Sequence, residues 1–245
     1  MNRRDFLFLS TIAPLVSYAN ISSGDIYLTQ DELHTLYSLD KRLRRLRGFV
    51  GYANFNIISF DTARYYARNY SKIGKFTPNE ITLVEKLFYS DPSTFGFYGD
   101  KTVDKITQKI DTKDIQKIPH SGHFIYKGKA LEDYTRMLKD IGDEIILTSG
   151  IRNVVKQLSL YISKLKTFDG NLTKASRVIA PPAYSYHTIS DFDIGKKGWG
   201  YRNFTADFAK TPEFTKMRQL NYVGIRYTIN NKDGVRFEPW HVKVI

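Results

Sequence analysis

The chain has 245 residues, a formal net charge of +12 at pH 7 and no cysteine, and 14% of its residues are aromatic. This length suits one large domain or two small ones with a real hydrophobic core, and the aromatic content excludes a disordered chain. Zero cysteines exclude disulfides and thiolate metal ligands, so any metal must be bound by His, Asp or Glu.

The first 19 residues have the pattern of an export signal. Paired arginines at Arg3 and Arg4 precede an apolar stretch that ends with small residues at Ser17 and Ala19. A buried N-terminal helix is the alternative, but Pro14 interrupts the stretch, which is also too short to span a bilayer. We therefore predict a signal of the twin-arginine type, cleaved after Ala19, and a periplasmic protein.

Residues 20–117 carry helix signals. The sequence TQDE at 29–32 is a capping box that opens a helix to about Arg47, and residues 61–70 have the pattern of a second helix. A second capping box, TPNE at 77–80, places proline at the first helical position. These signals predict an N-terminal helical region.

The densest basic run, KRLRRLR at 41–47, lies in the first of these helices. Its leucines recur at helical spacing, which indicates an amphipathic helix with a solvated basic face. A basic exported protein is attracted to anionic cell-wall polymers or to a membrane surface, whereas a basic protein in general can bind nucleic acid. Since the sequence has no zinc-finger, phosphate-loop or stacking motif, we expect no nucleic-acid binding.

Beyond Pro119 helices alternate with strands, and then strands dominate. This order predicts an α+β fold, a small and mostly antiparallel sheet with flanking helices. The expected helices cover 129–139 and 154–166, and the expected strands cover 144–148, 191–194, 224–229 and 235–237, the last two joined by a turn at 230–234.

Three short segments carry the residues of a hydrolytic site. They are SGIRNVVKQ at 149–157, SYHTISDFD at 185–193 and EPWH at 238–241. A neutral imidazole is the commonest zinc ligand, and a carboxylate held nearby can take the proton of a metal-bound water. Two imidazoles and one carboxylate leave a fourth tetrahedral position open for that water.

These segments resemble the zinc D-alanyl-D-alanine carboxypeptidase family, the VanY-like peptidases whose metal fold also occurs in the hedgehog signalling domain. The family pattern is Ser-Gly-x-Arg…Gln, then Ser-x-His with an Asp beyond it, then Glu-x-x-His. The resemblance covers roughly residues 118–245, which we expect to be a zinc peptidase domain. It implies one Zn²⁺ per chain, held by His187, an aspartate and His241, with Glu238 as the general base.

The same resemblance implies further roles in substrate binding. It places Arg152 beside the substrate carbonyl, where a fixed cation can stabilise the negative charge that develops during hydrolysis. It makes Gln157 a substrate-site amide. Ser185 and Trp240 occupy positions that shape the pocket.

The third ligand is Asp193 or Asp191. The family usually has six residues between its first zinc histidine and the aspartate, but here Asp193 follows His187 after five and Asp191 after three. On a strand, side chains two residues apart point to the same face, so the alternation of side chains does not decide which aspartate binds the metal. We favour Asp193 because its sequence context resembles the end of the family's strand.

The other histidines, His34, His120 and His123, lack a paired carboxylate motif, and we interpret them as surface or loop residues. Of the three, His123 is the one that could reach a substrate. The predicted function is a zinc peptidase that hydrolyses D-Ala-containing stem peptides of peptidoglycan, as a D,D-carboxypeptidase or D,D-endopeptidase. The alternative is a zinc-containing module that binds cell-wall peptides or a protein without cleaving them.

Overall fold

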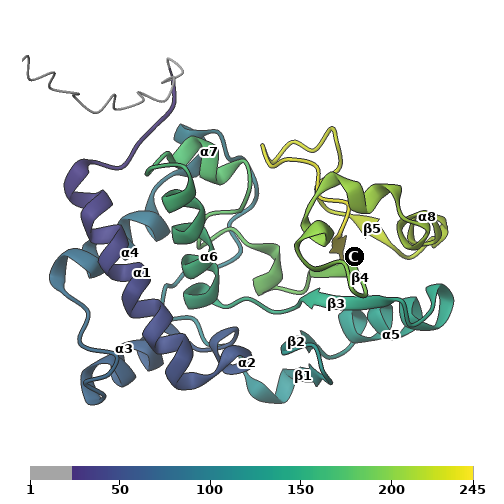
Figure 1. Cartoon of the computed structure of the whole chain (residues 1–245), viewed down its shortest axis with the longest axis horizontal. Coiled ribbons are helices and arrows are strands. Elements are labelled where there is room, and N and C mark those ends of the chain that lie inside the picture. Colours follow the sequence, from purple (N-terminus) through teal and green to yellow (C-terminus); the bar gives the residue numbers. More distant parts are fainter. Residues whose placement is uncertain (1–23, 245) are drawn as a thin grey trace, which may run out of the picture.

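The computed structural model describes residues 24–244, and the predicted export signal lies outside this range. Figure 1 shows two parts, a group of helices on one side and a sheet with its own helices on the other. Within residues 24–244, every helix is too short or too polar to cross a membrane.

Both predicted capping boxes are confirmed. In α1 (Gln30–Val50) the Thr29 side chain accepts from the backbone of Glu32, whose carboxylate accepts from Thr29 in return. The same reciprocal pair, Thr77 and Glu80, opens α4 (Pro78–Tyr89). Helix α1 runs three residues beyond the expected Arg47 and ends at Gly51 with φ +81°, a conformation in which glycine is unstrained.

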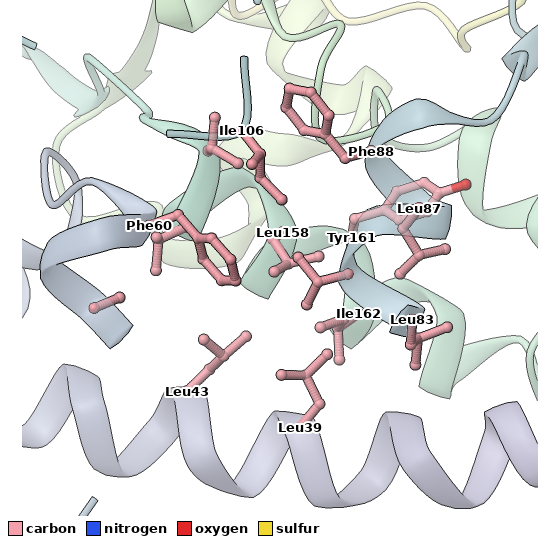
Figure 2. Close-up of a cluster of buried hydrophobic side chains, with 14 of the residues drawn as sticks. Leu39, Leu43, Phe60, Leu83, Leu87, Phe88, Ile106, Leu158, Tyr161 and Ile162 are labelled. Atoms are coloured by element: carbon pink, nitrogen blue, oxygen red, sulfur yellow. The ribbon is translucent and has the colours of Figure 1, made fainter. Parts of the chain in front are cut away.

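The helices of the N-terminal region share one core with a helix from the second half of the chain. Helix α6 (Val154–Thr167) packs against α1, and α3 (Phe60–Asn69) and α4 complete the core. Figure 2 shows how Leu39 and Leu43 of α1 point toward Leu158 and Ile162 of α6. The short helices α2 (Tyr52–Phe55) and α7 (Leu172–Ser176) border this core.

The second part is built on a four-stranded antiparallel sheet of order β3-β4-β6-β5. Helices α5 (Lys129–Ile141) and α8 (Pro212–Gln219) share its apolar core, which includes Leu147, Phe192 and Ile194. The strands are β3 (Ile145–Ser149), β4 (Phe192–Lys196), β5 (Gly224–Ile225) and β6 (His241–Lys243), and a separate hairpin joins β1 (Ile115–Ile118) to β2 (His123–Tyr126). The 3₁₀ helices are η1 (Pro92–Phe95), η2 (Thr112–Asp114), η3 (Tyr186–Thr188), η4 (Gly200–Phe204) and η5 (Ala206–Lys210). The expected α+β class is confirmed.

The predicted hairpin at 224–229 and 235–237 is wrong. Strand β5 is two residues long and pairs with β6, and residues 235–237 form no strand. The backbone groups of this segment are bonded elsewhere: Arg236 N donates to the Arg177 carbonyl, and the Asn231 side chain donates to the Val235 carbonyl. Residues 226–240 are therefore a long loop that leads into β6, and it places Glu238 just before that strand.

Candidate active site

Antiparallel pairing of β4 with β6 places Asp193 directly beside His241. Side chains that face each other in such a pair project from the same face of the sheet. His187 reaches them from η3, with its Nε2 3.3 Å from Asp193 Oδ1, and His241 Nδ1 lies 3.6 Å from the same oxygen. The three residues are buried, and each offers one ligand atom within 4.8 Å of the others.

A backbone carbonyl orients the His187 ring. Its Nδ1 lies 2.9 Å from the Gly150 oxygen. A carbonyl only accepts, so Nδ1 carries the proton and Nε2 is left with a lone pair that faces Asp193. Gly150 fits here because a Cβ at this position would collide with the Phe124 carbonyl.

Asp191 orients the other ring. Its Oδ2 lies 3.2 Å from His241 Nε2, on the side of the ring opposite Asp193. Arg226 donates to both oxygens of Asp191, at 2.7 and 3.0 Å, and Val244 N donates to Oδ1 at 3.1 Å. Both oxygens of the Asp191 carboxylate are therefore engaged in hydrogen bonds. His241 Nδ1 is the nitrogen that points toward Asp193.

The arrangement has the chemistry of a metal site. Among the described residues, His187 Nε2 and Asp193 Oδ1 have no hydrogen-bond partner although both are buried. Unpaired buried polar atoms are costly, and two lone pairs held this close repel each other. A cation between them would satisfy both atoms, and two imidazoles with one carboxylate are a typical catalytic zinc set. The residues present thus fit a divalent metal ion.

Burial and charge set the protonation of these groups. Burial, followed by the charge of Arg152, lowers the pKa of His187 to about 4. Burial would also lower the pKa of His241, but bonds to Asp191 and Glu238 and the charge of Asp193 raise it to about 9. Although burial alone would raise it, the pKa of Asp193 stays well below its usual range because His187 and Arg152 lie beside it.

Glu238 lies at the edge of this group. The backbone N–H of His241 donates to the Glu238 carbonyl at 3.1 Å, and this turn brings Glu238 Oε2 to 3.5 Å from His241 Nδ1. Burial raises the pKa of Glu238, while His241 opposes the change. A carboxylate with a raised pKa beside a metal site has the properties of a general base.

The remaining predicted residues line the same cavity of about 500 Å³. Arg152 donates through Nη2 to Asp193 and through Nε to Ser149, the latter at 2.8 Å. Gln157 is fully buried and donates to the Ala180 carbonyl at 2.7 Å, and its Oε1 has no partner among residues 24–244. Ser185 and Trp240 are buried in the wall.

His123 is not a surface residue. It lies on β2 with 4% of its surface exposed, and it lines the cavity. Its Nε2 is 3.2 Å from the Tyr52 hydroxyl, and burial lowers its pKa to about 4. The interpretation as a surface or loop residue holds for His34 and His120, whose side chains are exposed, but it is wrong for His123.

Sequence reasoning also missed Tyr52 and Lys156, which line the cavity. Tyr52 belongs to the helical region, for which the motifs gave no role. Lys156 directly precedes Gln157 in α6, and this position beside a predicted substrate-site residue was the available signal.

Comparison with known proteins identifies a family for the second half of the chain. Residues 126–245 match the family model described as VanY, D-alanyl-D-alanine carboxypeptidase. Among the curated proteins none matches the chain.

Similar solved structures include three peptidases. A Zn(II) complex of a mutant VanY D,D-pentapeptidase from a VanB-type vancomycin resistance cassette has 19% identity and a TM-score of 0.39, over 53% of this chain and 77% of that one. The LD-carboxypeptidase LdcB has 22% identity and a TM-score of 0.44, over 53% of this chain and 63% of that one. The D,D-dipeptidase VanXYg, bound to a D-Ala-D-Ala phosphinate analogue, has 21% identity and a TM-score of 0.44. The match covers 49% of this chain and 50% of that one.

The family match begins in β2 and includes all three predicted segments, while the first 125 residues lie outside it. Residues 126–245 therefore form a domain of the VanY family of D-alanyl-D-alanine carboxypeptidases, and the protein is a peptidase.

Proposed function

We propose that the protein is an exported zinc peptidase that removes the terminal D-Ala from stem peptides of peptidoglycan or cuts their D,D cross-links. The observation that carries this proposal is the convergence of His187, Asp193 and His241 on one cavity. Two of their buried atoms have no hydrogen-bond partner in the described part of the chain. The family assignment supports the class of substrate. The net charge of +12 suits a polyanionic cell wall.

His187 Nε2, an Asp193 oxygen and His241 Nδ1 would hold the zinc ion, and Asp191 and the Gly150 carbonyl would keep the rings in place. Such outer partners fix the tautomer and the orientation of a ligating histidine. When bound, zinc acts as a Lewis acid and lowers the pKa of a coordinated water towards about 7.

Glu238 is the proposed general base. Its carboxylate lines the cavity 3.5 Å from His241 and has a raised pKa. A base whose pKa lies closer to the working pH transfers protons more efficiently in both directions. Glu238 would accept a proton from the attacking water and then deliver it to the amine of the leaving D-Ala.

Arg152 is the proposed partner of the substrate carbonyl. Two of its nitrogens are bonded to Asp193 and Ser149, so the guanidinium is fixed in place. Its third nitrogen, Nη1, has no bond to any residue between 24 and 244 and is free for the substrate. A preorganised donor of this kind contributes roughly 2.7–4 kcal/mol to stabilising the transition state.

The test is mass spectrometry of defined monomeric and cross-linked muropeptides after treatment with zinc-loaded protein. Release of D-Ala indicates carboxypeptidase activity, and conversion of cross-linked dimers to monomers indicates endopeptidase activity. We expect Glu238→Ala to keep one zinc per chain while turnover falls by about 10²- to 10⁴-fold. Full turnover in this variant would contradict the proposed base, and muropeptides left intact by the parent protein would contradict the substrate class.

A further inference from the structure

Lys156 is a buried cation in the wall of the cavity. It lies on α6, and 7% of its surface is exposed. Lys156 and Lys164 of α6 line the same cavity as Arg152, which lies just before the N-terminus of that helix. The cavity therefore has a row of positive charge that leads away from the His187–Asp193–His241 group.

This ammonium group has no counter-ion among the residues that the structure describes. Across residues 24–244, no acceptor lies within hydrogen-bonding distance of Lys156 Nζ and no carboxylate within ion-pairing distance, whereas Lys166 on the same helix pairs with Asp40. Burial, followed by the charges of Arg152 and Arg47, lowers the pKa of Lys156 to about 8. Burying an uncompensated charge is costly, so an anion at this position would be bound favourably.

The helical region closes this part of the cavity. Lys156 Nζ lies 5.0 Å from the centre of the Tyr52 ring, and the Tyr52 hydroxyl is 3.2 Å from His123 Nε2. Tyr52 also packs against Gly122, where an added Cβ would clash with its ring. The three side chains come from α6, α2 and β2, so this corner of the cavity is built by both parts of the molecule.

We propose that Lys156, framed by Tyr52 and His123, forms a subsite that binds a carboxylate of the peptide substrate. The inference rests on the proposed function, since stem peptides carry carboxylates both at the C-terminus and within the chain. An ammonium group recognises either as a charge-assisted hydrogen-bond acceptor. The subsite makes carboxylate recognition depend on a segment, residues 52–56, that lies outside the family match.

The experiment measures binding by isothermal titration calorimetry in a zinc-loaded Glu238→Ala background, so that cleavage does not interfere. Three muropeptides are compared: one with all carboxylates free, one with only the C-terminus amidated and one with only the internal carboxylates amidated. We expect Lys156→Met to weaken binding of the free peptide by about 10- to 100-fold. The amidated peptide on which Lys156→Met has no effect identifies the carboxylate that Lys156 binds.

Two further variants test whether the effect depends on the positive charge at position 156. One removes a lysine elsewhere, and the other keeps the charge but changes the shape of the side chain. Lys139→Met removes the same charge from the exposed face of α5 and should leave binding unchanged. Lys156→Arg keeps the charge and should keep most of the affinity. We expect Lys156→Met not to lower the melting temperature, because it removes an unpaired buried charge.

Equal weakening of all three peptides by Lys156→Met, or weakening of none, overturns the subsite. This outcome is distinct from failure of the proposed function, in which the Glu238→Ala protein binds none of the peptides and the parent protein cleaves none of them.

Discussion

Both parts of the molecule bury paired charges, and the sheet region in addition holds the group of candidate metal ligands. In the helical core Arg42 and Glu80 are bonded to each other at 2.6 Å, and Ser38 donates to the same carboxylate at 2.8 Å. In that group of candidate ligands His187 Nε2 and Asp193 Oδ1 have no hydrogen-bond partner within residues 24–244. Removing one partner of a buried ion pair is costly, and buried polar atoms without a partner are a feature that a bound ion can explain.

Helix α6 links the two parts. Leu158, Tyr161 and Ile162 lie in the helical core, while Lys156 and Gln157 line the cavity. The helix thus anchors one wall of the site to a core that takes no part in the chemistry. Through this helix the first half of the chain, which lies outside the family match, supports the candidate site.

The largest stability effect is expected in the helical core. Glu80→Ala leaves Arg42 buried without its carboxylate and should lower the free energy of unfolding by about 3–5 kcal/mol. Glu32→Ala is the matched control, because Glu32 has the same place in the other capping box but pairs with the half-exposed Lys86. Its cost should be about 1 kcal/mol or less. Chemical denaturation measures the free energy of unfolding of both variants. An equal decrease in the two variants would contradict the role assigned to burial.

A smaller effect is expected in the sheet region, on metal affinity. Asp191→Asn keeps an oxygen near His241 but removes the charge that pairs with Arg226. Loss of such an outer partner typically weakens metal binding about 10- to 100-fold. Zinc affinity measured by competition with a chelator tests this prediction, and Asp140→Asn, on the exposed face of α5, is the control. An unchanged affinity would show that Asp191 does not orient the ring.

Much of the fold was predictable from local sequence. The capping boxes at Thr29 and Thr77 set the starts of α1 and α4, because the atoms that cap a helix lie within three residues of each other. The last strand was mispredicted for the opposite reason. Residues 235–237 alternate in a strand-like way, but their backbone bonds to Arg177, a partner far away in sequence.

Prediction of the site likewise succeeded where local sequence carries the information and failed where distant contacts do. The motifs named His187, Asp193 and His241, which the structure brings together, and their role as zinc ligands remains a prediction. Sequence parity could not separate Asp191 from Asp193. In the structure Asp191 lies beside Nε2 of His241 and Asp193 lies beside Nδ1 of the same ring. Asp191 also accepts a hydrogen bond from Arg226. Tyr52 and His123 reach the cavity only through the packing of the two parts, which no local pattern encodes.

The smallest effect concerns the junction between the two parts and depends on pH. The pKa of His123 in the folded protein, about 4, lies below its ordinary value of 6.5, so the unfolded chain binds more protons between these values. Stability therefore falls as the pH decreases from about 6.5 towards 4. Between pH 7.5 and 5.5 this histidine should account for a loss of about 1 kcal/mol.

His123→Gln keeps hydrogen-bonding groups near Tyr52 and Asn56 but cannot take up a proton. Its free energy of unfolding, measured by urea denaturation at pH 7.5 and 5.5, should therefore fall by about 1 kcal/mol less than that of the parent protein. His34→Gln, on the exposed side of α1, controls for the loss of a histidine as such. The same pH dependence in the parent protein and in His123→Gln would mean that the junction opens enough for His123 to be protonated in the folded state. In that case the helical region would not seal this side of the cavity.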